Sequence, residues 1–408
     1  MRAETLPLRQ EAAVLNGITL ALPRAMRTID NPNAASPVLA HPFARVIVAL
    51  SIVAAPASIP FFAKQPTYGT GTSRTPSNIT GVTGGGASPS TSGGVSVATH
   101  GAMGNCSADD TSAFRNAASA AASANVPLVV PAPSGACYKL TGTVHIGTSV
   151  IGVGYPLVKV FSANGTISYD MFEVDNYTGS GLWITGLRLE GSWDPTGQDA
   201  NGREKGTGIG LYSSRNITIQ DNLIQNNEGD NIYLGTGSAG ANQNILITNN
   251  TLLNPFRCAV ALINAGTQSS PASGVIVMNN VITKLNSFVG SIDFEPNNPS
   301  TEAVWNTEVA YNNITIPSSM RPAGLSNEIN WAVTLTNSTG RGGNIYLHDN
   351  FGSFGSIQEG GSGGPGFLYT GNLGANYAPW INVHVSNNVS GGQGSTPPQA
   401  PTNLRIIS

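Results

Sequence analysis

Six short segments of one pattern recur along this chain, about 30 residues apart. Each is an apolar stretch that ends in Asn-Asn or Asp-Asn. They occupy residues 216–224, 244–253, 274–282, 307–315, 344–351 and 382–390. The equivalent asparagines are Asn222, Asn250, Asn280, Asn313, Asn350 and Asn388, at steps of 28, 30, 33, 37 and 38 residues. Self-similarity at this period predicts stacked units that bury their apolar faces against one another.

Apolar residues alternate within these segments, as in Ile217/Ile219 and Val275/Val277, which is typical of strands with one buried face. A second apolar run precedes each segment, at 208–212, 231–235, 260–263, 292–296, 333–336 and 367–370. Several short strands per repeat of about 30 residues predict the coils of a parallel β-solenoid. We interpret the repeated asparagines as a structural ladder that bonds from coil to coil, with solvated turn residues as the alternative.

Composition limits the classes of function. Charged residues make up 10% of the 408 residues, against about 25% in ordinary globular proteins. The net charge is −3 and no basic run occurs, so nucleic acid is not expected as a partner. A surface of neutral polar residues suits an exported protein that contacts carbohydrate, and we expect a monomer.

The termini differ in composition from the repeats. Residues 1–63 form an N-terminal extension in which 41–57 resemble a signal peptide, with Arg45, a short apolar core and an Ala-Pro-Ala site. The apolar core is too short to span a membrane, and an amphipathic or disordered extension is the alternative. Residues 64–98 and 391–408 are rich in Gly, Ser, Thr and Pro, which predicts flexible linkers. We therefore expect a secreted or cell-surface protein with one domain at 99–390.

The segment 100–154 predicts a different structure from the repeats. Asp109 or Asp110 can cap an Ala-rich helix over Ser112–Asn125, in which Phe114 is the large apolar residue. Such a helix would cover the open first coil, as the ends of solenoids require.

The three cysteines leave one pairing open. Cys106 and Cys137 flank the segment around this helix and can either pair or remain free. Cys258 has no evident partner in the sequence and is interpreted as a buried apolar residue.

The stretches GAMGNCSADDTSAF, VPLVVPAPSGACYKL and VIGVG resemble the opening of the pectate-lyase-like superfamily, near its rhamnogalacturonase-like and epimerase-like members. The resemblance covers about residues 99–390 and implies an all-β fold, a right-handed parallel β-helix with an N-terminal capping α-helix. Asn105 stands where that pattern usually has Asp. The superfamily includes lyases, hydrolases, epimerases and adhesins, so the resemblance implies a polysaccharide partner without fixing the reaction.

Two acidic residues in the run IDFEP are the strongest catalytic candidates. If Ile292 and Phe294 point inward, Asp293 and Glu295 point outward, roughly 6–7 Å apart at Cα. A carboxylate pair at this spacing suits acid and base catalysis on a glycosidic bond, and a solvated pair is the alternative. Because both are expected to face solvent, their amide replacements should leave folding intact.

Further candidates come from neighbouring runs and turns. Asp230 is a third catalytic candidate or a turn cap, and Tyr233 offers a ring on which a sugar can stack. Arg257 and Lys284 can bind acidic or hydroxyl groups of a substrate or be plain surface charges. Trp193 can stack on a sugar or pack against its own loop.

These observations favour an exported carbohydrate-active protein that cleaves an extracellular polysaccharide as a lyase or glycoside hydrolase. A non-catalytic glycan-binding or surface-structural module is the alternative. The polygalacturonase patterns Asn-Thr-Asp, Gly-Asp-Asp, Gly-His-Gly and Arg-Ile-Lys are absent, and IDFEPN lacks the His of mannuronan epimerases. No Cys/His cluster has metal-ligand spacing, so no metal or cofactor is expected, although carboxylates around Asp230 and Asp293 could bind calcium. His348 is interpreted as a surface residue.

Overall fold

The computed structural model of this protein describes Ile79 and residues 82–161, 169–193, 206–236, 240–263, 272–284, 290–296, 303–316, 331–335, 341–354, 356–359, 366–369 and 380–391. The segment that resembles a signal peptide and nearly all of the predicted C-terminal linker lie outside these residues. Among the described residues, no helix has the length and apolar character that crossing a membrane requires.

The described strands form three parallel sheets. Sheet 1 contains, in spatial order, β1 Val95–Ser96, β2 Leu128–Val130, β5 Val150–Gly152, β8 Leu182–Thr185, β11 Arg215–Gln220, β14 Gln243–Thr248, β17 Ala272–Met278, β20 Ala303–Ala310, β23 Arg341–His348 and β27 Trp380–Ser386. Sheet 2 contains β3 Tyr138–Leu140, β6 Leu157–Val160, β9 Arg188–Glu190, β12 Leu223–Gln225, β15 Thr251–Leu253, β18 Val281–Thr283, β21 Asn313–Thr315, β24 Phe351–Ser353 and β28 Val389–Ser390. Sheet 3 contains β4 Val144–His145, β7 Phe172–Asp175, β10 Ile209–Tyr212, β13 Ile232–Gly235, β16 Val260–Ile263, β19 Ile292–Glu295, β22 Trp331–Leu335, β26 Gly366–Tyr369 and β25 Ser356–Glu359.

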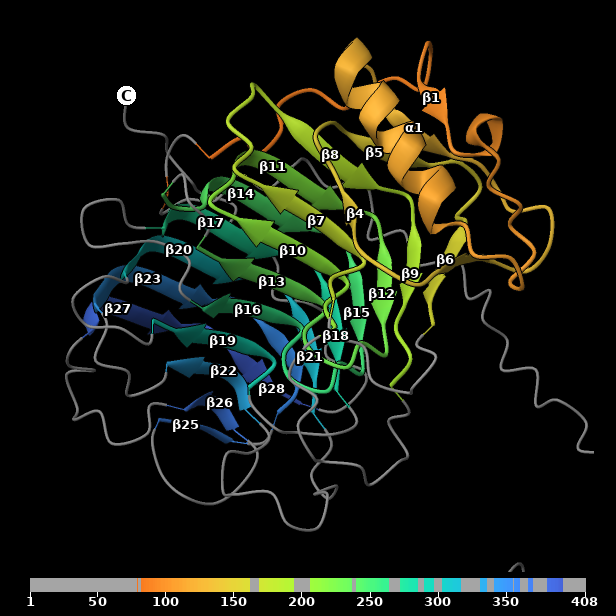
Figure 1. Ribbon diagram of the computed structural model, residues 1–408. Coiled ribbons are helices and arrows are strands. Elements are labelled where there is room, and N and C mark those ends of the chain that lie inside the picture. The colour runs from red at the N-terminus through yellow and green to blue at the C-terminus, as the bar shows by residue number, and fades with distance from the viewer. Residues whose placement is uncertain are drawn as a thin grey trace, which may run out of the picture. The chain divides into compact units, whose positions relative to one another are not determined.

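The chain adds one strand to each sheet per coil. It runs through β11, β12 and β13 in turn and then returns to sheet 1 as β14, beside β11. Figure 1 shows this stack of strands, with helix α1 (Thr111–Ala124) over the end near β1 and β4. The fold is the right-handed parallel β-helix with an N-terminal capping helix that the sequence predicts.

Inward side chains form continuous apolar columns. Ile217 pairs with Ile245, which pairs with Val275, and all three are fully buried. Burial of such a side chain stabilises the fold by about 1.5–3 kcal/mol. The alternation predicted from the sequence is therefore confirmed for these strands, while Val383 and Val385 in the last strand of sheet 1 are only partly buried.

Helix α1 begins and ends one residue earlier than predicted. Asp109 accepts the backbone N–H of Thr111 at 3.0 Å, whereas the carboxylate of Asp110 binds the backbone N–H groups of Met103 and Lys139. Phe114 is fully buried, and its ring lies 5.3 Å from that of Tyr138. Asp110 thus holds the N-cap position without a side-chain capping bond and binds the flanking segments, whereas Asp109, one residue earlier, accepts the first N–H of the helix.

Cys106 and Cys137 form a disulfide, with Cα atoms 4.8 Å apart, which resolves the pairing that the sequence left open. Cys258 is free and buried, as expected.

Two parts of the predicted linker 64–98 are attached to the β-helix, namely residues 83–85 and the strand Val95–Ser96, while the residues between them are mostly exposed. The backbone N–H of Thr83 donates to Asn244 Oδ1 at 2.8 Å, and that of Gly85 donates to Thr218 Oγ1 at 2.7 Å. Val95–Ser96 is a strand of sheet 1. Small and polar composition predicted mobility here, but the backbone donors find acceptors on the outer face of sheet 1.

The asparagine ladder is present, with one member shifted by a residue. Its members are Asn222, Asn250, Asn280, Asn312, Asn350 and Asn388. Asn312 and not Asn313 is the member in the fourth coil, because Tyr311 takes the left-handed position, at φ 57°, that precedes each ladder residue. In the other coils that position belongs to Asp221, Asn249, Asn279, Asp349 and Asn387. The left-handed conformation is thus adopted by the residue before the ladder asparagine.

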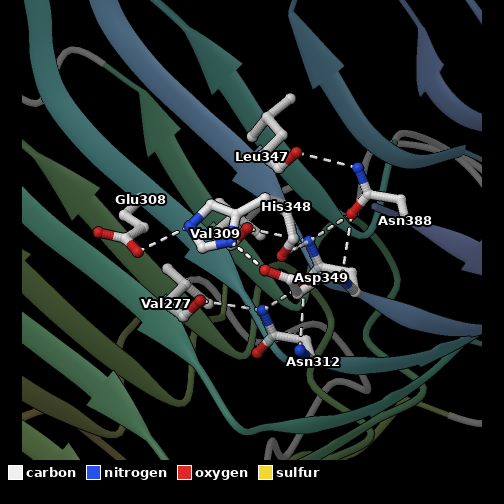
Figure 2. Close-up of polar contacts among 9 residues, drawn as sticks. Val277, Glu308, Val309, Asn312, Leu347, His348, Asp349 and Asn388 are labelled. Atoms are coloured by element: carbon white, nitrogen blue, oxygen red, sulfur yellow. Dashed lines mark hydrogen bonds and ion pairs between the residues drawn. The ribbon is translucent and has the colours of Figure 1, made fainter. Parts of the chain in front are cut away.

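Each ladder amide joins two coils (Figure 2). Asn312 Oδ1 accepts both the backbone N–H and the side-chain Nδ2 of Asn280, each at 3.0 Å. Its Nδ2 donates to Val277 O at 2.9 Å and to Asn350 Oδ1 at 2.9 Å. These amides are buried, so they satisfy backbone groups at a corner that water does not reach.

A second ladder, which was not predicted from the sequence, runs within the strands of sheet 1. Its members with positive φ are Asn216, Asn244, Asn306, Asn344 and Asn382, with Gly274 in the same column. Asn344 Nδ2 donates to Asn306 Oδ1 at 2.8 Å, and Asn382 continues the chain of bonds to Asn344.

We predict that Asn312→Ala lowers the free energy of unfolding by about 3 kcal/mol, because buried groups that it now satisfies would each lose about 1–3 kcal/mol. The matched control is Asn313→Ala, a partly exposed neighbour, which should change it by no more than about 0.5 kcal/mol. Denaturant unfolding measures both. Equal effects of the two substitutions would contradict the assignment of Asn312 to the ladder.

His348 is buried between two carboxylates and not on the surface. Its Nε2 lies 2.8 Å from Glu308 Oε1, and its Nδ1 lies 2.7 Å from Asp349 Oδ2 (Figure 2). The ring of Tyr311 packs edge-on at 5.6 Å. Burial alone would lower the pKa of His348, but the hydrogen bonds and charges of Glu308 and Asp349 outweigh it and raise the pKa above its usual value.

This arrangement predicts a pH-dependent stability. A raised pKa in the folded state means that the contribution of His348 is fully present below the unfolded pKa of about 6.5 and is lost as pH rises through the folded pKa. The free energy of unfolding should therefore fall over this interval in denaturant titrations. His348→Gln should remove that slope, and a slope that persists in this variant would assign it to other groups.

Candidate functional site

The outward residues of sheet 3 form rows that cross the coils. One row contains Glu173, Gly210, Tyr233, Ala261, Asp293 and Thr334. Between them Ile292 and Phe294 point inward and are fully buried in the apolar core, so the predicted register of IDFEP is confirmed.

A hollow of about 450 Å³ lies on this face over β7, β10 and β13, which are neighbours in Figure 1. It is lined by Thr143, Tyr169, Asp170, Glu173, Gly206, Thr207, Tyr212, Asp230, Tyr233 and Arg257. Three carboxylates, one guanidinium and three phenols thus come together from coils that are distant in sequence.

Asp170, Thr207 and Asp230 hold equivalent places in successive coils. They stand two residues before Phe172, Ile209 and Ile232, which are paired in register. Asp170 and Asp230 are therefore two strand spacings apart, roughly 9.6 Å at Cα.

Asp170 has the electrostatic character of a proton donor. Burial raises its pKa to about 6, against the opposing effect of a hydrogen bond from Tyr212. The Tyr212 hydroxyl donates to Asp170 Oδ2 at 2.7 Å, which orients the carboxyl group. Gly210 makes this pair possible, because a Cβ there would collide with Asp170 Oδ2.

Asp230 is held from the other side of the hollow. Its Oδ1 accepts the backbone N–H of Cys258 at 2.8 Å and lies 3.9 Å from Arg257 Nε. Burial raises the pKa of Asp230, and the charge of Arg257 opposes that shift. Arg257 also lies 3.5 Å from Glu295 Oε2 and is only 13% exposed, so its charge is shared between two carboxylates.

The expectation that Asp293 faces solvent is wrong. Asp293 points away from the apolar core, but it is fully buried and accepts a short hydrogen bond from Thr334. Burial raises its pKa well above the usual value, and Glu295 adds to the shift. At this point the outward row is therefore not open surface. Asp293 belongs to a polar cluster that includes Arg257.

Two of the predicted binding residues are also buried. Lys284 is 1% exposed, and its burial lowers its pKa to about 8. Trp193 is 4% exposed and packs edge-on against Phe256 at 5.5 Å. Both interpretations of Lys284 placed it at the surface, and they are wrong. Trp193 packs inside the protein, against Phe256, which is nearer to its packing alternative than to sugar stacking. Glu295 is partly exposed, at 29%.

Of the seven predicted site residues, Asp230, Tyr233 and Arg257 line the hollow. The sequence analysis missed Asp170, Glu173 and Tyr212. A signal for Asp170 existed, because extending the position of Asp230 back by two coils leads to it. Asp170 was not predicted because the strand that follows it, FEVD, precedes the first segment of the repeat.

No group of three or more His, Cys, Asp or Glu in the described part of the chain is placed to hold a metal ion. Asp230 and Asp293 lie next to the positive charges of Arg257 and Lys284, which compete with any cation for their oxygens.

Comparison with known proteins gives structural likeness only. No protein-family profile and no curated protein sequence matches the chain. Among solved structures, the Agl-KA catalytic domain is 16% identical over 74% of this chain and 49% of its own length, with a TM-score of 0.46. The chain thus spans about half the length of that domain.

Two others are 14% identical. One is the catalytic unit of a GH87 α-1,3-glucanase from Streptomyces thermodiastaticus, over 76% of this chain and 71% of that one, with a TM-score of 0.31. The other is PfbA, a surface adhesin of Streptococcus pneumoniae, over 72% and 90%, with a TM-score of 0.34. At these values the likeness assigns no function to this chain.

The burial of Asp293 predicts that Asp293→Asn stabilises the protein at neutral pH. A carboxyl group with a raised folded pKa contributes most below its unfolded pKa of about 3.9 and costs stability as pH rises above it. The variant should therefore unfold at a higher temperature than the wild type at pH 7, and the difference should shrink toward pH 4. Asp175→Asn, at an exposed position of β7, is the control and should change neither value. A lower unfolding temperature for Asp293→Asn at pH 7 would contradict this account.

Proposed function

We propose that this protein hydrolyses an extracellular polysaccharide in the hollow over β7, β10 and β13. The observation that carries the proposal is the position of Asp170, a buried carboxyl group with a pKa of about 6, two coils from a second carboxylate in the same hollow. Paired carboxyl groups with different environments are what hydrolysis of a glycosidic bond requires.

Asp170 is the proton donor in this proposal. A group with a pKa of about 6 is partly protonated near neutral pH and can protonate the leaving glycosidic oxygen. Tyr212 holds the carboxyl group in place through its hydroxyl.

Asp230 is the general base. It removes a proton from a water molecule whose oxygen attacks the anomeric carbon, while the bond to the leaving oxygen breaks and Asp170 supplies that oxygen with a proton. Thr207 lies between the two carboxylates in the order of strands. The Cα atoms of Asp170 and Asp230 are roughly 9.6 Å apart, two strand spacings. We propose the inverting mechanism for this pair, in which the two carboxyl groups are about 6.5–9.5 Å apart and leave room for the water.

The proposed setting is the cell exterior. The disulfide between Cys106 and Cys137 is of the kind that persists in oxidising compartments. The resemblance of residues 41–57 to a signal peptide supports the same setting.

The test is a polysaccharide panel in which new reducing ends are measured. Asp170→Asn should lower kcat by at least about 100-fold, because it removes the proton donor. The wild-type rate should fall as pH rises above about 6, where Asp170 loses its proton. Asp175→Asn removes a carboxylate at the end of β7, outside the lining of the hollow, and should leave the rate unchanged.

Two outcomes would overturn this proposal. Glycan binding without turnover, unchanged in Asp170→Asn, would identify a non-catalytic glycan-binding module. An unsaturated product that absorbs ultraviolet light would indicate β-elimination, which calls for a base that takes a carbon-bound proton and not for the carboxylate pair.

A further inference from the structure

The two tyrosines of the hollow lie diagonally across two strands. In β10 and β13, Gly210 pairs with Tyr233, and Tyr212 pairs with Gly235. Each of these two outward rows thus has one glycine beside one tyrosine. The glycine is on β10 in the first row and on β13 in the second. The glycines leave the backbone bare at the positions where the tyrosine rings need space.

The rings lie close to this bare backbone. A Cβ on Gly235 would stand 2.5 Å from a ring carbon of Tyr233 and 3.0 Å from the ring of Tyr212. A Cβ on Gly210 would stand 2.9 Å from the Tyr212 ring. Both rings line the hollow, and their centroids are 5.6 Å apart at a tilt of 46°.

Acidic residues outnumber basic residues in the lining of the hollow. Among the described residues that line it, Asp170, Glu173 and Asp230 are acidic, and Arg257 is the one Lys or Arg. Asp170 carries a proton in the proposed function, so the negative charge that a substrate meets comes from Glu173 and Asp230. Arg257 already lies between Asp230 and Glu295, at 3.9 and 3.5 Å. An incoming carboxylate or sulfate would therefore meet carboxylates and a guanidinium whose charge is already balanced.

We propose that this hollow accepts an uncharged pyranose and discriminates against uronates and sulfated sugars. The inference rests on the proposed function and adds the class of substrate. The apolar face of the sugar stacks on Tyr212 and Tyr233, and its hydroxyls donate to the surrounding carboxylates. Like-charge repulsion excludes an acidic ring, which is a common way in which sites gain specificity.

The experiment compares each neutral polysaccharide of a panel with its own derivative oxidised at C6 to a uronate. The values of kcat/KM for the neutral member should exceed those for the oxidised member by at least about 10-fold. The ratio should decrease as salt is raised from 0.05 to about 0.5 M, because added ions screen the repulsion. Affinity measured by calorimetry on Asp170→Asn gives the same comparison without turnover.

Charge variants identify the source of the discrimination. Glu173→Gln removes one lining carboxylate and should reduce the neutral-to-oxidised ratio several-fold. Asp175→Asn removes an exposed carboxylate outside the lining and should leave the ratio as it is. A ratio that responds equally to both would show a general charge effect and overturn the proposal.

Ring variants test the stacking. Tyr233→Phe keeps the ring and should bind the neutral glycan within about 3-fold of the wild type. Tyr233→Leu removes the ring and should weaken binding by about 10-fold, which is about 1.4 kcal/mol. Equal loss in both variants would contradict a stacking role.

The outcomes separate this inference from the proposed function. Faster turnover of the oxidised polymers would overturn the inference and leave hydrolysis intact. Absence of both binding and turnover across the panel would overturn the proposed function, and the inference with it.

Discussion

The buried amides of the asparagine ladder are the interaction on which the rest of this structure depends. A parallel coil of short strands has backbone donors and acceptors at every corner, and a buried corner without partners would be strongly destabilising. At one corner the ladder satisfies them with a single side chain per coil, as Asn312 does between Asn280 and Asn350. Because each amide binds both neighbours, it also fixes the register of one coil on the next, so the outer rows of sheet 3 stay aligned.

That alignment is what assembles the candidate site. Asp170 and Asp230 are separated by 60 residues in sequence but occupy equivalent positions two strands apart. Neither carboxylate lies in a sequence motif that would identify it as functional. The candidate site arises from residues that stack in register across the coils. Gly210 and Gly235 leave space for Tyr212 and Tyr233, and the guanidinium of Arg257 lies near the carboxylates of Asp230 and Glu295.

The fold could be predicted from the sequence to a large extent, and the site only in part. The alternation of apolar residues identified the strands, and the recurring Asn-Asn and Asp-Asn pairs identified the corner. In the triplet Tyr311-Asn312-Asn313 the pair alone could not show which asparagine is buried, because the residue in the left-handed position is usually Asn or Asp and here is Tyr311. The second ladder was visible as the Asn that stands just before the alternating apolar residues, such as Asn216 before Ile217 and Asn344 before Ile345, but was not interpreted.

The errors at the site have a different cause. Register placed Asp293 on the outward side correctly, but sequence does not show which part of an outward face is covered by other segments. Lys284 was likewise expected at the surface, and only the packing around it shows that it is buried. Asp170 was missed because a column of functional residues extended beyond the segments that repeat most clearly.

The attachment of residues 83–85 to sheet 1 has a consequence for the order of folding. Thr83 binds Asn244, which is 161 residues away, whereas successive coils pair over only about 30 residues. Closure over so long a loop is slow and entropically unfavourable until its target strand exists. During synthesis the segment leaves the ribosome early, yet it has nowhere to dock before β11 and β14 have formed. Its attachment is therefore a late step, and until then the outer surface of those strands stays accessible to other chains.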